Sequence, residues 1–114
     1  MTYTIIWEYL VKADALTDFE RAYRPGGLWA QLFARADGYL GTELHRDLED
    51  ERRFVTVDYW SSRQAHERFL EHYGAPYAAL DRACAAFTDQ EIQVGNFSCF
   101  GTGRNFRDER STAL

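Results

Sequence analysis

The sequence is poor in lysine, in cysteine and in long apolar runs. Lys12 is the only lysine, and the 13 basic residues fall short of the 18 acidic ones, which leaves a net charge of −5. Such a chain lacks the basic face that sequence-independent binding to nucleic acid requires. No run of like charges marks a membrane-binding surface, no apolar run could span a bilayer, and the N-terminus does not resemble a secretory signal. We therefore expect a cytoplasmic protein without nucleic-acid or membrane partners.

Patterns typical of metal sites are absent as well. Cys84 and Cys99 lie far apart in the chain and have no histidine at the spacing of metal ligands. His66 and His72 are six positions apart, so on a helix they do not share a face as ligand pairs at i and i+4 do. We expect both cysteines to be reduced, buried thiols, and we predict no metal site.

The length and composition predict one small globular domain. The chain has 114 residues, of which 46% are hydrophobic and 16% aromatic, so it can bury a modest core. Aromatic residues are spread over residues 1–100, which we interpret as a single domain. Residues 101–114 are polar and rich in arginine, and we expect this C-terminal tail to be loose unless a partner orders it.

Hydrophobic periodicity predicts the element order βαββαβ. Strand patterns rich in β-branched and aromatic residues cover residues 3–12, 39–47, 52–60 and 90–100. Apolar residues recur at helical spacing over residues 14–24 and 28–36, with a break at residues 25–27. They recur again over residues 63–73 and 77–87, with a break at residues 74–76. This order is typical of the ferredoxin-like α+β sandwich, in which helices cover one face of the sheet.

The expected strands are apolar on both faces, although helices can cover only one. In the third strand the two alternating sets are Val55, Val57 and Tyr59, and Thr56, Asp58 and Trp60. In the first strand they are Tyr3, Ile5, Trp7 and Tyr9, and Ile6 and Leu10. In the last strand alternation places Ile92, Val94 and Phe100 opposite Phe97 and Cys99. A bare apolar sheet face marks an interface, so we predict a homodimer that packs sheet against sheet. The helices should then cover the face that holds Asp58 and Trp60.

The stretch GYLGTELHRDLEDERRFVTVDYWSSRQAHERF, residues 38–69, resembles the antibiotic biosynthesis monooxygenase family. The resemblance rests on Gly38 before the second strand, on Arg46-Asp47 at its end, and on Trp60-Ser61-Ser62 before the second helix. It implies a dimeric α+β barrel in which each subunit holds a pocket between its sheet and its helices. In quinone-forming members, an anthrone or naphthol is deprotonated and reacts directly with O2, without a metal or a flavin.

Four residues are candidate catalytic groups. Trp60 matches the pocket tryptophan of the family, and the resemblance implies that its indole ring and N–H orient the substrate. Thr56 stands where some relatives carry an asparagine, and it keeps a hydrogen bond while losing the amide. Asp58 shares a face with both, and a carboxyl group in apolar surroundings has a raised pKa and can act as a general base. Glu8, on the first strand, is a similar candidate.

These catalytic candidates also have structural interpretations, which the sequence leaves open. Trp60 could plug the junction between strand and helix, and Asp58 could be an acid at the sheet edge paired with Arg63 or Arg68. His45, on the second strand, could face either the barrel interior or the dimer interface, or serve as a structural histidine.

Aromatic residues of the helices are candidates for substrate binding: Trp29, Phe33, His66, Tyr73 and Tyr77. The first two follow the Gly-Gly break and could belong to a lid over the pocket or to a plainly kinked helix. The two tyrosines flank the second break and could frame the pocket opening. His66 could also be a lone base or an exposed helix residue.

The resemblance predicts a cofactor-independent monooxygenase whose partners are O2 and a phenolic or polycyclic aromatic molecule. One alternative is a small-molecule binding or stress-related protein with the same dimer and no chemistry. Another is a non-redox isomerase or cyclase that uses Asp58 or Glu8 as its base. The arginine and alanine bias is typical of bacterial genomes rich in G and C.

Overall fold

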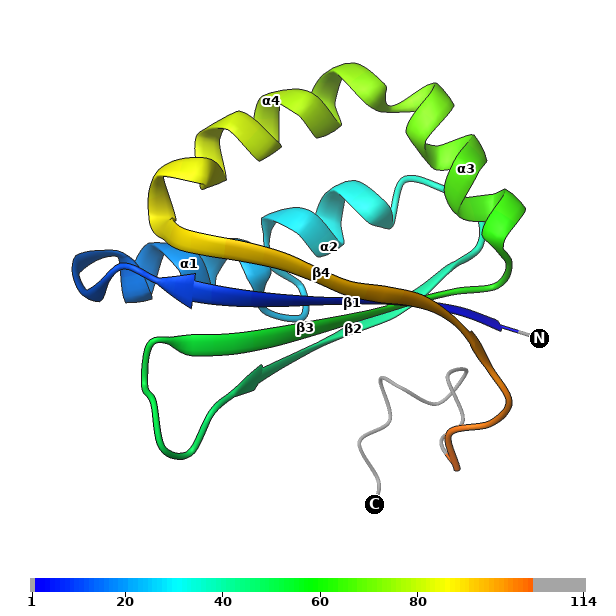
Figure 1. Cartoon of the computed structure of the whole chain (residues 1–114). Helices are drawn as coiled ribbons and strands as arrows, with labels where there is room; N and C mark the ends of the chain where they lie inside the picture. The colour runs from blue at the N-terminus through cyan, green and yellow to red at the C-terminus, as the bar shows by residue number, and fades with distance from the viewer. Residues whose placement is uncertain (1, 104–114) are drawn as a thin grey trace.

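A computed structural model of the chain describes residues 2–103, which form a layer of helices over one antiparallel sheet (Figure 1). The strands are β1 (Thr2–Val11), β2 (Tyr39–Arg46), β3 (Arg53–Trp60) and β4 (Thr88–Cys99). The α-helices are α1 (Leu16–Tyr23), α2 (Leu28–Phe33), α3 (Arg63–His72) and α4 (Gly74–Cys84), with short 3-10 turns at Ala13–Ala15 and Ala85–Phe87. The order confirms the predicted ferredoxin-like α+β fold.

The strand order in the sheet is β2-β3-β1-β4, and each neighbouring pair is antiparallel. β3 therefore lies between β2 and β1, where Asp58 is directly opposite Thr42 on one side and Ile5 on the other. Directly opposed residues share a face of the sheet. This register assembles one continuous row of side chains from three strands below the helices.

The predicted helix break at residues 25–27 is present, whereas the second break lies at Tyr73 and not at residues 74–76, which form the first turn of α4. Gly26 has a φ of 76°, a left-handed conformation that glycine adopts without strain, and it separates α1 from α2. α3 ends at His72, and α4 begins at Gly74. The start of α3 is capped by Ser62, whose Oγ accepts a hydrogen bond of 3.0 Å from the Ala65 backbone N–H.

An aromatic core fills the space between helices and sheet. Phe19 and Tyr23 of α1 stack with ring centroids 4.1 Å apart, and Phe19 also contacts Phe54 of β3. Phe33 of α2 and Phe69 of α3 meet edge to face at 5.3 Å. Rings from three helices therefore pack on the sheet and hold the helical layer at a set height above it.

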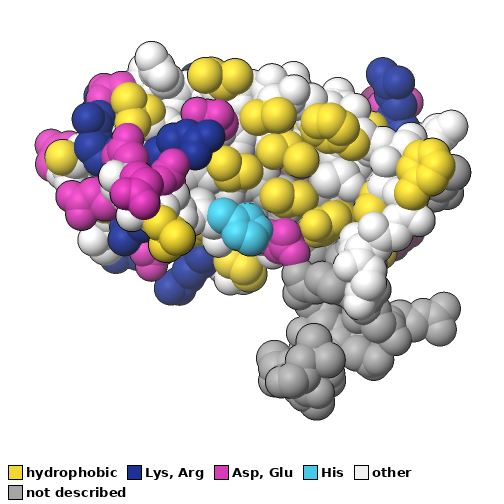
Figure 2. All heavy atoms as spheres, turned by 60° about the horizontal axis from the view of Figure 1, so that its bottom comes forward, with side chains coloured by type: hydrophobic (Ala, Val, Ile, Leu, Met, Phe, Trp, Pro, Cys, Tyr) yellow, Lys and Arg dark blue, Asp and Glu magenta, His cyan; other side chains and the backbone are white. Residues whose placement is uncertain are grey.

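The opposite face of the sheet has no covering layer in the described part of the chain. Figure 2 shows hydrophobic side chains gathered along the middle of this face. The assignment of Val57 and Ile6 to this face is confirmed, because they are direct partners in the β1–β3 register and alternate with core residues. Ile92 and Phe97 of β4 are 49% and 43% exposed.

The alternation predicted for the last strand is wrong. Ile92 pairs with Glu8 and Phe97 pairs with Thr4, and both partners lie on the same face of β1. A β-bulge between Ile6 and Trp7 inserts an extra residue into β4, so the face of every later residue is inverted. The strand also ends at Cys99, before Phe100. Most of the predicted tail, residues 104–114, lies outside the described residues.

Candidate functional site

A cavity of about 450 Å³ lies between the helical layer and the sheet. Its floor comes from β1 and β3, with Trp7, Thr56 and Asp58 among the lining residues. Trp29 and Phe33 of α2 form part of an aromatic wall. The volume is in the range of ordinary small-molecule sites.

The rim of the cavity is polar and comes from α3, α4 and β4. Arg63 and Glu67 of α3 form an exposed ion pair at 3.5 Å between Nε and Oε2. Asp81 of α4 and Glu91 of β4 are also exposed lining residues. The interior is therefore aromatic, whereas the entrance is charged.

Asp58 is the ionisable group on the cavity floor. Burial raises the pKa of its carboxyl group to about 6, and the hydrogen bond from Thr42 acts in the opposite direction. Thr42 Oγ1 donates to Asp58 Oδ1 at 2.7 Å, and Tyr39 Oη lies 2.6 Å from the same Thr42 oxygen. A carboxyl group with this pKa is largely ionised at pH 7 and basic enough to accept a proton.

Trp60 lines the cavity, and its side chain is fully buried from bulk solvent. Its ring makes edge-to-face contacts with Phe33 at 5.6 Å, Tyr39 at 5.5 Å and His66 at 5.1 Å. Among residues 2–103, Trp60 Nε1 has no hydrogen-bond partner, and this atom is inaccessible to solvent. In this conformation Trp60 supports the rings around the cavity and does not present its N–H to a ligand.

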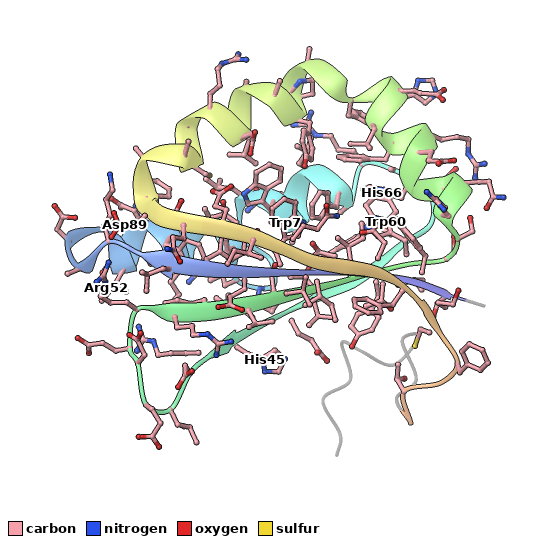
Figure 3. All side chains as sticks on the ribbon, viewed as in Figure 1. Trp7, His45, Arg52, Trp60, His66 and Asp89 are labelled. Atoms are coloured by element: carbon pink, nitrogen blue, oxygen red, sulfur yellow. The ribbon has the colours of Figure 1, made fainter. Side chains whose placement is uncertain are left out.

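His66 projects from α3 towards Trp60, and both lie on the helix side of the sheet in Figure 3. Its ring also contacts Tyr3 with centroids 5.8 Å apart. Burial lowers the pKa of His66, so the imidazole is neutral at pH 7. A neutral ring can hydrogen-bond a ligand without adding charge to the cavity.

Four tyrosines line the cavity: Tyr3, Tyr9, Tyr23 and Tyr77. Burial raises the pKa of Tyr9, of Tyr23 and of Tyr77. Each of these three phenols therefore stays protonated at pH 7 and can donate a hydrogen bond to a ligand oxygen.

The structure brings most of the predicted site residues together in this cavity. Its lining includes, from the predicted set, Thr56, Asp58, Trp60, Trp29, Phe33, His66 and Tyr77. α2 packs into the core, where Trp29 and Phe33 are both 8% exposed, so in this structure they form a wall.

Two predicted site residues lie elsewhere. Glu8 is on the opposite face of the sheet, where Oε2 accepts a hydrogen bond of 3.0 Å from Arg53 Nε. Tyr73 does not line the cavity, and its hydroxyl donates to the Arg35 carbonyl at 3.2 Å. His45 also lies on the open face, below the sheet in Figure 3, and its Nε2 is 3.1 Å from Glu43 Oε1.

Sequence reasoning missed Trp7, Tyr9 and Thr42 as cavity residues. The alternation of the first strand had placed Trp7 and Tyr9 on one face, but the choice of face required the register with β3. Thr42 is 8% exposed and lies opposite Asp58, a contact that no local pattern of the second strand announces.

No cluster of three or more potential metal ligands occurs among the described residues. Within the same part of the chain, no helix combines the length and the apolar character needed to cross a bilayer.

The fold and the cavity define a ferredoxin-like α+β protein with an aromatic-walled cavity between its sheet and its helices. The model of the antibiotic biosynthesis monooxygenase family matches residues 2–79, and the chain belongs to this family. No protein with a curated function matches the chain significantly.

Solved structures share the fold at low sequence identity. SnoaB, a cofactor-independent oxygenase from Streptomyces nogalater, is similar with a TM-score of 0.74 and 21% identity, over 91% of this chain and 98% of SnoaB. PA3566 from Pseudomonas aeruginosa has a TM-score of 0.67 and 18% identity, over 88% of this chain and 95% of its own. A conserved protein from Methanosarcina mazei Go1 has a TM-score of 0.65 and 10% identity, over 85% of this chain and 91% of its own.

Proposed function

We propose that the protein is a cofactor-independent monooxygenase that oxidises a phenolic or polycyclic aromatic molecule with O2. The observation that carries this proposal is Asp58, a carboxyl group with a pKa near 6 on the floor of an aromatic-walled cavity. Membership of the family and the similarity to SnoaB support the same reaction class.

The chemistry begins with a proton transfer. The Asp58 carboxylate takes a proton from an acidic C–H or O–H of the bound aromatic, and the resulting anion gives an electron to O2. For an aryl-flanked CH2 group, one oxygen atom of O2 ends in the new carbonyl and the other leaves as water. The carbon loses four electrons and O2 gains four, so no further reductant is needed.

The cavity walls favour this reaction through binding and orientation. Trp7, Trp29 and Phe33 offer flat apolar surfaces to a polycyclic substrate. The hydroxyls of Tyr9 and Tyr77 can donate to an oxygen on which negative charge develops, because their raised pKa values keep them protonated.

Oxygen uptake by purified, chelator-treated protein tests the proposal on a panel of anthrones and naphthols. We expect uptake above the buffer rate with the native chain and a large loss with Asp58→Asn, while ligand binding persists. The matched control is Glu8→Gln, which removes a carboxylate from the opposite face and should retain the rate. Absence of uptake across the panel, or equal rates for native protein and Asp58→Asn, contradicts the proposal.

The same cavity also suits a non-redox proton transfer, because Asp58 can accept a proton whether or not O2 follows. Substrate incubated in D2O under nitrogen separates the two reactions. Deuterium incorporation without any oxygen consumption in air would favour an isomerase or cyclase. Saturable binding with neither outcome would favour a binding protein.

We also propose that the open sheet face packs against the same face of a second copy. Ile6, Val57, Ile92 and Phe97 lie on this face. Figure 2 shows hydrophobic side chains gathered along the middle of it. Burying such a face in a two-fold arrangement removes the apolar surface from water.

A further inference from the structure

Asp58 of β3 accepts a hydrogen bond from a chain of two hydroxyl groups that both belong to the neighbouring strand β2. Thr42 Oγ1 lies 2.7 Å from Asp58 Oδ1 and 2.6 Å from Tyr39 Oη. A threonine hydroxyl has a single hydrogen, so while Thr42 donates to Asp58 it must accept from Tyr39. The hydrogen bonds therefore run in one direction, from the phenol through the threonine to the carboxylate.

A β-bulge makes this chain possible. Tyr39 and Thr42 are three positions apart, and strict alternation would place them on opposite faces of the sheet. The register shift between Tyr39 and Gly41 inserts one extra residue, so that Tyr39 is opposite Trp60 and Thr42 is opposite Asp58. Both hydroxyls then lie on the helix side, and bulges beside active sites commonly re-aim side chains in this manner.

Tyr39 is itself held by rings of the core. Its ring centroid lies 5.5 Å from that of Phe33 and 5.5 Å from that of Trp60. The buried indole of Trp60 therefore supports the phenol whose hydroxyl directs Thr42. This packing gives Trp60 an indirect connection to Asp58, although its own N–H is inaccessible.

We propose that Thr42, directed by Tyr39, is the positioning residue for Asp58: it occupies Oδ1, fixes the carboxylate plane and leaves Oδ2 to take the substrate proton. Among the described residues, no hydrogen bond is made to Oδ2. The role in proton transfer rests on the proposed function, whereas the hydrogen bond to Oδ1 does not depend on it.

Other ionisable groups face Asp58 across the cavity. They come from several elements around it: Tyr3 and Tyr9 of β1, Tyr23 of α1, Arg63, His66 and Glu67 of α3, Tyr77 and Asp81 of α4, and Glu91 of β4. These groups are the same in Thr42→Ser and Thr42→Val, so a comparison of the two variants tests the hydroxyl group at this position.

Carbon-13 NMR titration of Asp58 in the full chain, without substrate, tests the assignment. Thr42→Val keeps the shape of the side chain and removes the hydroxyl, and it should raise the pKa of Asp58 by about 1 to 2, because a hydrogen bond to the charged form is lost. Thr42→Ser keeps the hydroxyl and should titrate as the native protein does. Tyr39→Phe should shift the pKa in the same upward direction by a smaller amount.

The titration decides the inference independently of turnover. A native pKa for Asp58 in Thr42→Val, or equal pKa values in the Ser and Val variants, overturns it. If Thr42→Val does not fold, Tyr39→Phe decides in its place, and an unchanged pKa in that variant overturns the inference. A shifted pKa with no oxygen uptake by native protein contradicts only the proposed function. Where turnover exists, Thr42→Val should lower kcat with KM retained and move the acid limb of the pH profile upwards, and Thr42→Ser should restore both.

Discussion

Asp58 and Thr42 are direct partners across neighbouring strands, and Asp58 Oδ1 accepts a 2.7 Å hydrogen bond from Thr42 Oγ1 on the face that the helices cover. The carboxyl group therefore combines two opposing influences. Burial in the cavity destabilises the charged form and raises the pKa, whereas the hydrogen bond from the Thr42 hydroxyl stabilises the charged form and lowers the pKa. The balance is a group that is ionised at neutral pH and remains a useful base.

The first prediction concerns the pH dependence of turnover. Because the carboxylate is the active form of Asp58, kcat/KM should rise tenfold per pH unit at low pH. The profile should level off above a midpoint near pH 6. Initial rates of oxygen uptake from pH 4.5 to 8 measure this profile. A rate that is flat through pH 6, or that falls there as pH rises, would exclude Asp58 as the base.

The second prediction concerns stability. A raised pKa means that the folded protein binds the Asp58 proton more tightly than the unfolded chain does. The associated stability is fully present below the ordinary pKa of 3.8 and is lost as pH rises through about 6. The side chain that replaces the carboxyl group in Asp58→Asn is neutral at every pH, so this variant does not lose stability as pH rises through 6. We expect the free energy of unfolding of Asp58→Asn, relative to native protein, to increase by about 2 kcal/mol between pH 4 and pH 8.

Urea unfolding of both proteins at the two pH values provides the measurement, and the comparison at pH 4 is its internal control. A difference in unfolding free energy that is the same at both pH values would show that burial does not perturb Asp58.

The third prediction concerns Gly38, which directly precedes β2 and lies against the start of α3, where its carbonyl accepts a hydrogen bond from the Ser61 N–H. Its φ is +94°, and an added Cβ would lie 2.6 Å from Ala65 Cβ and 2.7 Å from Ser61 Oγ. Gly38→Ala should therefore lower the free energy of unfolding by roughly 2–3 kcal/mol. Gly74→Ala is the matched control, because an added Cβ there meets nothing within 4 Å. Equal unfolding midpoints for the two variants in urea would contradict the prediction.

The fourth prediction concerns the open sheet face. Ile6 lies at the middle of β1, opposite Val57 and Gly95, so Ile6→Lys would bury one lysine from each subunit in the interface of the proposed dimer. We expect the dimer dissociation constant to rise roughly 100-fold, because an unpaired charge in an apolar interface is costly. Leu48→Lys, at a residue that is 98% exposed in the β2–β3 hairpin, should leave association unchanged.

Light scattering across a concentration series distinguishes these variants. A native chain that has the mass of a monomer at micromolar concentration would remove the proposed interface altogether.

The order of elements could be predicted from the sequence because it depends on local periodicity. Alternation over Phe54 to Trp60 was sufficient to divide β3 into two faces. Helical spacing located the four α-helices of residues 2–103 and the break between α1 and α2, but placed the break between α3 and α4 after Tyr73 instead of at it. The aromatic content of both faces then predicted that neither face of the sheet is exposed to solvent. The same local pattern placed Asp58 and Trp60 on one face, and the family resemblance identified Trp60 as the tryptophan of the pocket.

Register, bulges and helix rotation could not be predicted in this way, because each depends on contacts between distant parts of the chain. Bulges inverted the face of Ile92 relative to Phe97 and brought Tyr39 to the side of Thr42, where periodicity of two predicts the reverse in both cases. The sequence by itself determined that a carboxylate would lie on a strand face rich in aromatics. The sequence also predicted that the helices would cover this face, but only the tertiary structure decided which side chains line a cavity there, and that a threonine 16 positions away donates a hydrogen bond to the carboxylate.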